Sequence, residues 1–215
     1  AFSWMNIHLL LEGLLVTIEV AVLTIIFSVI LGYILGVVRY VEIPVVSKAV
    51  GGVIDIIRNL PLLLIIFFSY FALPELGLSL NVFWSTVVAM SIFEASMVSE
   101  IIRGGLKAIP KGQTEAALSS GLSNSDVMRY ILLPQATKDT LPSIVNQLIA
   151  LIKDTSLATI ITLPEITHNA KIIYGQNTNY VIPMFIALAF LYFIVCYSLS
   201  LFSKYLANKM AFESR

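Results

Sequence analysis

Acidic residues lie in or beside long apolar stretches of the sequence, where a charged side chain is costly; they include Glu19, Glu94, Glu100 and Asp154. Glu94 follows Ile92 and Phe93, and no basic residue lies within two helical turns of it. Asp154 follows Lys153 near the end of another apolar stretch. A charge at the centre of a bilayer costs about 2.5–3.5 kcal/mol on insertion scales, so such residues are candidates for function. If the carboxylates of Glu94 and Asp154 both face one cavity, they favour a cationic ligand.

Neutral polar side chains near these carboxylates offer hydrogen bonds to the same ligand. The candidate substrate-binding residues are Ser91, Glu94, Asn146, Gln147 and Asp154. Asp154 also has a purely structural interpretation. Its carboxylate could pair with the neighbouring Lys153, or it could cap the turn that contains Thr155 and Ser156.

The composition is that of a membrane protein. Hydrophobic residues form 58% of the 215 positions and charged residues 12%, against about 45–50% and 25% in soluble domains. The 13 basic residues balance the 13 acidic ones, so no net charge attracts nucleic acid. Cys196 is the only cysteine, which excludes an internal disulfide or a cysteine metal site. We therefore predict an all-α integral membrane protein, with lipid as a partner and no nucleic acid.

Apolar runs long enough to cross a bilayer recur along the whole chain. A hydrocarbon core about 30 Å thick needs roughly 20 apolar residues in a helix. About five such runs emerge, so we predict one transmembrane domain over residues 1–215 as a bundle of about five helices. The predicted spans are roughly 9–38, 51–73, 82–106, 136–153 and 180–208. Between them, where a missing backbone donor costs least, lie Pro44, Pro74, Pro110, Pro134 and Pro164.

Basic residues predict the orientation, because lysine and arginine are retained on the cytoplasmic side. Flanking the first connection, the third connection and the tail are Arg39, Lys48, Arg58, Arg103, Lys107, Lys111, Arg129, Lys138, Lys204, Lys209 and Arg215. Only Lys153 and Lys171 lie on the opposite side. The N-terminus is therefore expected outside and the C-terminus inside, and segment 107–135 is expected in the cytoplasm.

This cytoplasmic segment has the local signals of two short helices that meet at a corner. The predicted parts are a Thr114 cap, a helix from Glu115 to Ser120, a left-handed Gly121, a second helix starting at Ser123 or Asn124, and an end near Pro134. Ala116, Ala117, Leu118 and Leu122 make the corner small and apolar. Asp126 and Arg129 are spaced to pair on the second helix. Such a corner either fills a groove on another molecule or packs beneath its own helices.

The corner also carries a sequence motif. The run Gly112-Gln113-Thr114-Glu115-Ala116-Ala117, then Gly121, then Ile131-Leu132-Leu133-Pro134-Gln135-Ala136 resembles the EAA signature of ABC importer permeases, in particular the polar amino acid permease family. Three other runs resemble that family in the same order: Arg58-Asn59-Leu60-Pro61, Glu100-Ile101-Ile102-Arg103-Gly104-Gly105 and Lys153-Asp154-Thr155-Ser156-Leu157. The resemblance covers nearly the whole chain.

The resemblance implies a multi-pass permease subunit of a prokaryotic inner membrane, whose corner docks onto a cytoplasmic ATPase subunit present in two copies. The implied coupling residues are Glu115, Ala116, Ala117, Gly121, Leu122, Asp126 and Arg129. No Gly-x-x-x-x-Gly-Lys-Ser/Thr loop occurs in the sequence. ATP and magnesium are therefore expected on the partner, and the chain itself is expected to bind no cofactor or metal and to be no enzyme.

Further partners follow from the same resemblance. They are a second permease copy, expected to form a homodimer, and an external substrate-binding protein that docks on segments 74–81 and 154–180. The cargo is expected to be a polar amino acid. Glu94 and Asp154 favour arginine, lysine or histidine, while the family also allows glutamine, glutamate or cystine. Glu100, with Arg103 three residues later, is interpreted as a structural pair.

Two other classes fit the sequence less well. An intramembrane hydrolase needs a serine and a histidine within the bilayer, but His8 and His168 lie at or beyond the predicted outer boundary, and no Gly-x-Ser-x-Gly motif is present. A secondary transporter often has a duplicated half with interrupted spans in matching positions, and no such duplication is visible in the sequence.

Overall fold

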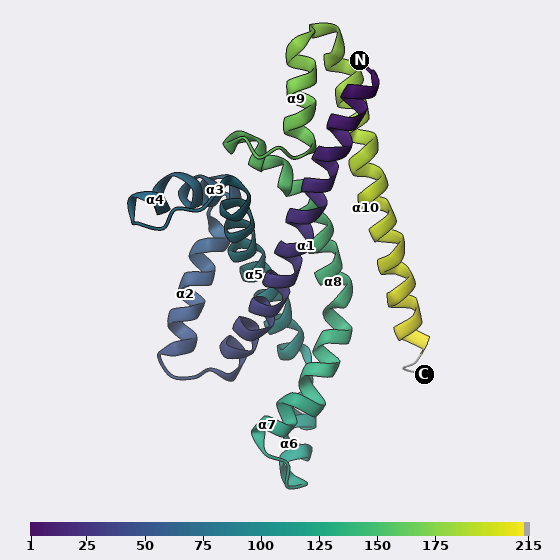
Figure 1. Cartoon of the computed structure of the whole chain (residues 1–215). Coiled ribbons are helices and arrows are strands. Elements are labelled where there is room, and N and C mark those ends of the chain that lie inside the picture. Colours follow the sequence, from purple (N-terminus) through teal and green to yellow (C-terminus); the bar gives the residue numbers. More distant parts are fainter. Residues whose placement is uncertain (213–215) are drawn as a thin grey trace.

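The computed structural model describes residues 1–212, with side chains described through Tyr205. Arg215 and the side chain of Lys209, both counted in the basic tail, lie outside that part. The helices are α1 (Trp4–Val41), α2 (Val46–Asn59), α3 (Leu62–Phe67), α4 (Leu73–Glu75), α5 (Val82–Ala108), α6 (Lys111–Ser119), α7 (Asn124–Asp126), α8 (Leu133–Asp154), α9 (Ile166–Gln176) and α10 (Val181–Phe212). Joining them are the π-helical turns η1 (Phe68–Ala72) and η2 (Val127–Leu132) and the 3-10 helices η3 (Thr155–Ile161) and η4 (Thr178–Tyr180). Figure 1 shows an elongated bundle with α1 running along most of its length.

Each predicted span has a counterpart in the bundle. Four helical stretches are long and apolar enough to cross a membrane, namely Trp4–Val41, Val82–Ala108, Asn124–Ile161 and Thr178–Tyr205. A fifth crossing is available if the bent pair Val46–Asn59 and Leu62–Glu75 forms one span. The prediction of an all-helical bundle of about five spans is confirmed for the described residues.

The second predicted span, 51–73, is not one continuous helix. The chain bends by 104° between its two halves. Leu60 and Pro61 have extended ψ values of 144° and 130°, because a proline disfavours helical geometry at the residue before it and brings no N–H of its own. Pro74, predicted between spans, lies inside α4 instead.

The prediction that the second cytoplasmic helix ends near Pro134 was wrong. The chain continues as one helix from Asn124 to Ile161. The wider π turn η2 precedes the proline, and the N–H of Leu133 bonds to the carbonyl of Met128, five residues earlier. Pro134 then occupies one of the first positions of α8, where its missing N–H is tolerated. The helix also continues through Pro142.

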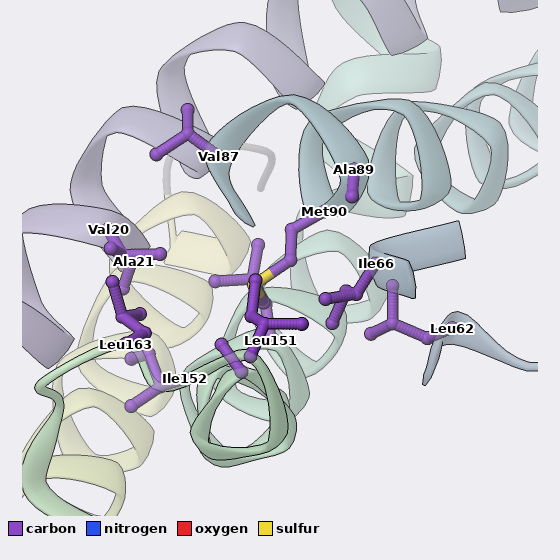
Figure 2. Packing of buried hydrophobic residues seen from close by; sticks show 12 residues of the cluster. Val20, Ala21, Leu62, Ile66, Val87, Ala89, Met90, Leu151, Ile152 and Leu163 are labelled. Carbon is purple, nitrogen blue, oxygen red and sulfur yellow. The ribbon is translucent and has the colours of Figure 1, made fainter. Parts of the chain in front are cut away.

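The core joins α1, α3, α5 and α8. Figure 2 shows Val20 and Ala21 of α1 with Met90 of α5 and Leu151 of α8 in one apolar cluster. Close packing of α1 on α5 requires small residues along α1. A Cβ atom at Gly36 would lie only 2.8 Å from the backbone oxygen of Ser99 on α5.

Candidate functional site

The corner between α6 and α7 is held by backbone geometry. Gly121 has φ +90°, a left-handed conformation that glycine adopts without steric cost, as predicted. Ser123 caps the next helix and shares a reciprocal capping box with Asp126, which confirms one of the two predicted starts. The Thr114 cap was wrong, because α6 begins at Lys111 with Pro110 before it. The fixed φ of proline suits the start of a helix.

The tip of this corner exposes apolar side chains. Leu118 and Leu122 are 40% and 39% exposed, while Ala117 is buried against the chain's own helices. Glu115 and Ala116 are exposed. The predicted coupling residues therefore divide into an exposed tip and a buried support. Exposed leucines beside a rigid turn suit docking into a groove on another protein.

The predicted ion pair between Asp126 and Arg129 is absent among the described side chains. The Asp126 carboxylate instead accepts from the Ser123 hydroxyl, 2.5 Å away. The Arg129 guanidinium lies 5.4 Å from the centre of the Tyr130 ring. The Ser123 cap and the Tyr130 ring thus take the places that Asp126 and Arg129 would have for each other in an ion pair.

A side-chain hydrogen bond that the sequence analysis missed joins the corner to the start of α8. The Gln135 side chain donates to the Gln113 side-chain oxygen at 2.8 Å and to the Ile131 carbonyl at 2.8 Å. Both glutamines belong to the motif quoted above, but their 22-residue separation gives no local signal of contact. This hydrogen bond ties α6 to the start of α8.

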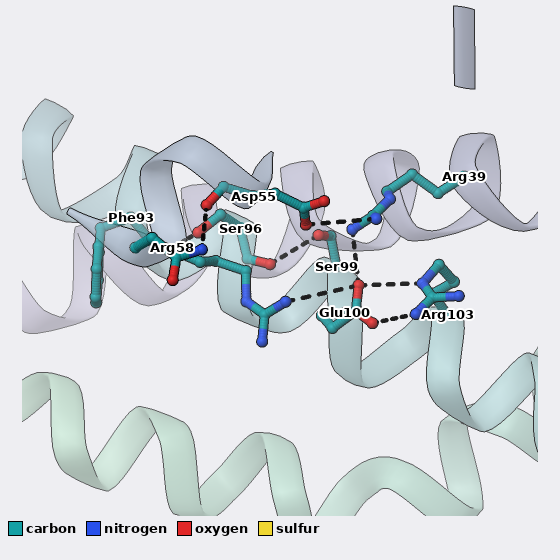
Figure 3. A network of polar contacts seen from close by, with 9 residues as sticks. Arg39, Asp55, Arg58, Phe93, Ser96, Ser99, Glu100 and Arg103 are labelled. Atoms are coloured by element: carbon teal, nitrogen blue, oxygen red, sulfur yellow. Dashed lines mark hydrogen bonds and ion pairs between the residues drawn. The ribbon is translucent and has the colours of Figure 1, made fainter. Parts of the chain in front are cut away.

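A cluster of charged residues joins α1, α2 and α5 (Figure 3). The Glu100 carboxylate accepts from Arg39 at 2.7 Å and pairs with Arg103 on its own helix, and Arg58 lies 3.9 Å away. Asp55 gives Arg39 a second partner at 3.5 Å. The predicted structural pair is thus confirmed. The sequence analysis missed Arg39, Asp55 and Arg58, which reach it from other helices.

Glu94 lies inside the protein with no exposed surface. The Gln147 side chain of α8 donates to its Oε2 atom at 3.0 Å. Its Oε1 atom, and the hydroxyl of Ser91 one turn earlier on α5, have no hydrogen-bond partner among the described residues. Such orphaned buried groups call for a functional explanation or an additional bound group. The structure therefore brings together three predicted residues: Ser91, Glu94 and Gln147.

The other two predicted substrate residues are placed differently. Asn146 is exposed, on a different face of α8 from Gln147. Asp154 is partly buried at the end of α8, and its side chain makes no hydrogen bond in the described structure. Thr155 and Ser156 donate instead to backbone carbonyls, so the alternative of an Asp154 cap was wrong. Glu94 and Asp154 are not in direct contact.

Segment 154–180, which the sequence predicts to be external, is folded. Glu165 is buried and accepts from the backbone N–H groups of Thr167 and His168, which caps α9. Burial raises the pKa of the Glu165 carboxyl above its usual value. The backbone N–H of Ile166 also donates to the Thr17 hydroxyl of α1 at 3.3 Å. This segment thus presents a fixed surface above the spans.

Several independent comparisons agree on the class of protein. Residues 25–212 match the family described as "Binding-protein-dependent transport system inner membrane component". A probable glutamine ABC transporter permease, GlnP of Bacillus subtilis (strain 168), is 51% identical over 94% of this chain and 93% of its own length. The arginine transport permease ArtQ of the same organism is 36% identical over 95% and 94%.

A solved structure described as an amino acid ABC transporter with histidines gives TM-score 0.86 at 27% identity, covering 97% of this chain and 99% of that one. The overall fold of this chain is thus that of a known transporter architecture. The chain belongs to the binding-protein-dependent transport system inner membrane component family. It is the membrane permease of an ABC importer and works with a separate ATPase and an external binding protein.

Proposed function

We propose that this permease carries a polar amino acid of the glutamine type. The observation that carries the proposal is the 51% identity, over almost the full length of both chains, to a probable glutamine permease. The side chains around Glu94 support it. The unpartnered Oε1 atom accepts an N–H group, and the Ser91 hydroxyl donates or accepts. The side-chain amide of glutamine offers both kinds of group.

A basic cargo is the second candidate. It is favoured by the carboxylate of Glu94, whose Oε1 has no partner, and by the 36% identity to an arginine permease. The two carboxylates do not form one joint site for a cation, as the sequence had suggested. Gln147 already donates to Glu94, and Asp154 makes no contact with it. Glutamate and cystine belong to the same class of cargo.

The partners follow from the corner and from the orientation of the chain. We infer that segment 107–135 lies in the cytoplasm and that its tip docks onto an ATPase subunit that binds ATP and magnesium. Two permease copies, proposed to be identical, and two ATPase copies complete the importer. An external binding protein is proposed to dock on segments 74–81 and 154–180.

ATP hydrolysis by the reconstituted complex, measured with a panel of amino acids delivered by the binding protein, tests the cargo. Glutamine is expected to stimulate hydrolysis, and leucine serves as the apolar control. Stimulation by arginine but not by glutamine would overturn the first candidate in favour of the second. No stimulation by any polar amino acid would contradict both.

A variant of Glu94 separates the two candidates further. Glu94→Gln keeps a hydrogen-bonding oxygen but removes the charge. A glutamine cargo is expected to lose less than about tenfold in stimulated rate, because neutral hydrogen bonds remain, whereas a cationic cargo loses a charge-assisted bond and nearly all stimulation. Identical losses for glutamine and arginine would show that Glu94 does not select the cargo.

A further inference from the structure

A large cavity lies between the lower end of α1, the end of α5 and the helical corner. Its volume is about 950 Å³. Tyr40 and Glu42 form one side, and Lys107, Lys111 and Arg129 lie around the other sides. Arg129, one of the implied coupling residues, lines the cavity, but Leu118 and Leu122 at the docking tip do not, and neither do Glu94 and its neighbours.

The charges around the cavity are unbalanced. Three cations surround it and only one carboxylate, that of Glu42, faces them. In the described part of the chain, no ion pair involves Lys107, Lys111 or Arg129. Elsewhere in the molecule arginines are matched with carboxylates, as in the Glu100 cluster. The cavity therefore suits an anion.

The position and the lining of the cavity indicate the kind of anion. Lys107 lies in the last turn of the span Val82–Ala108 and Tyr40 in the last turn of the span Trp4–Val41, so the cavity opens where two spans end. Ile109, Val127 and Leu132 are buried apolar residues that also line it. Basic pockets between helices at the cytoplasmic boundary bind lipid headgroups, and an apolar floor suits the adjoining glycerol and acyl chain.

The cavity also lies apart from the docking tip. In Figure 1 the chain between α6 and α7 forms the lowest point of the molecule, and the lower end of α1 lies above it. The cavity is lined by the ends of α1 and α5 and by Thr114, Asn124 and Ser125 of the corner, whereas Leu118 and Leu122 do not line it, so it lies on the side of the corner that adjoins the two spans. A lipid reaches this side directly, whereas an ATPase bound to the tip approaches from below.

We propose that this cavity binds the phosphate headgroup of an anionic phospholipid of the cytoplasmic leaflet. The inference rests on the proposed cytoplasmic position of the corner. The bound phosphate bridges Lys107 of α5 and Lys111 of α6, across the short link that joins the membrane span to the corner. The lipid thereby steadies the corner against α1.

Native mass spectrometry of the purified complex tests the proposal after incorporation into nanodiscs of equal parts phosphatidylglycerol and phosphatidylcholine. The wild type is expected to retain phosphatidylglycerol preferentially. The double variant Lys107→Gln/Lys111→Gln is expected to retain phosphatidylglycerol about 25-fold more weakly. Each lysine accounts for about fivefold, because that is the usual contribution of one basic residue near an anionic surface. Lys48→Gln is the matched control, because Lys48 is exposed near the same end of the bundle and does not line the cavity.

Equal retention by the double variant and the Lys48→Gln control would overturn the proposal, as would equal retention of the two lipids by the wild type. Inorganic phosphate at matched concentration is expected not to displace the lipid. If inorganic phosphate displaces the lipid at equal concentration, the proposal of a lipid ligand would be overturned in favour of a soluble phosphate. ATP hydrolysis stimulated by amino acids, measured in nanodiscs of pure phosphatidylcholine, tests the proposed function separately. Failure of the lipid proposal can therefore be distinguished from failure of the proposed function.

Discussion

Glu100 connects three helices through one carboxylate. Arg39 comes from 61 residues earlier and Arg58 from α2, yet both meet the same oxygen atom, Oε2. With Asp55 as the only other carboxylate in the cluster, the three arginines depend on Glu100 for charge balance. A partly buried cluster of this kind is sensitive to the loss of its central member.

Replacing Glu100 by glutamine is therefore expected to lower the free energy of unfolding by about 1.5–3 kcal/mol, the usual range for hydrogen bonds to charged groups. Thermal unfolding of the detergent-solubilised complex measures the effect. Glu12→Gln is the control, since Glu12 pairs with His8 at an exposed site, where such pairs contribute about 0–1 kcal/mol. An equal loss for both variants would contradict a central role for Glu100.

Gly121 allows a second experiment on a single residue. A side chain at φ +90° is strained even though nothing lies within 4 Å of the position, at a cost of about 1–2 kcal/mol. Gly121→Ala is expected to deform the corner and to reduce co-purification of the ATPase subunit. Gly112→Ala is the control, because this position also has open space and no positive φ. Undiminished co-purification with Gly121→Ala would exclude the corner as the docking element.

Not every local prediction was correct, since the Thr114 cap and the Asp126–Arg129 pair were wrong. Some features that depend on neighbouring residues were nevertheless predictable from the sequence. The left-handed Gly121 and the Ser123 cap belong to this group, because each is decided within one helical turn. Partners brought from distant helices were not predictable: Arg39 on Glu100 and Gln113 on Gln135 depend on how spans pack. For Glu94, the residue was identified as unusual, but its full burial follows only from the fold.

At the scale of elements, prolines account for two predictions that were wrong, in opposite directions. Pro61 breaks its helix by 104°, whereas Pro134 follows a π turn and the helix continues. The same residue type thus ends one element and extends another. Local rules restrict the residue before a proline, but whether the chain bends or widens depends on what packs around it. The number of spans was therefore predictable, and their internal shape was not.

The contact between α1 and α5 supports a prediction at this scale. Gly36→Ala would place a Cβ atom 2.8 Å from the Ser99 carbonyl oxygen, so the two helices must separate. A loss of about 1–3 kcal/mol in the free energy of unfolding is expected, as for other overpacked cores. Gly104→Ala has nothing within 4 Å and is expected to be neutral or to stabilise α5 by up to about 1 kcal/mol. Unfolding temperatures of the two variants distinguish these effects, and a stable Gly36→Ala would show that α1 moves without cost.

For the whole molecule, α8 has one exposed face that is too polar for lipid. Exposed along it are Asp139, Ser143, Asn146 and Lys153. By contrast, α10 exposes large apolar side chains, among them Phe190 at 62%. Polar residues in spans normally face a partner or a water-filled path. This contrast supports the proposed homodimer, with α8 toward the second copy and α10 toward lipid.

Cross-linking tests this arrangement in a Cys196→Ser background, which removes the only native cysteine. Asn146→Cys is expected to give a permease dimer with a short bifunctional thiol reagent. Phe190→Cys on α10 is the matched control and is expected to remain monomeric on a denaturing gel. A dimer band from Phe190→Cys alone would place the pairing surface on the opposite side of the molecule.

The unbroken helix from Asn124 to Ile161 has a mechanical consequence. Gln147 lies on the same helix as the capped start of the corner, about 35 Å away at the usual rise per residue. A rigid tilt of about 5° at the lower end would displace Gln147 by about 3 Å. That displacement equals the length of its bond to Glu94. If the helix tilts as a rigid body, a small rotation at the corner would therefore be enough to open this buried contact.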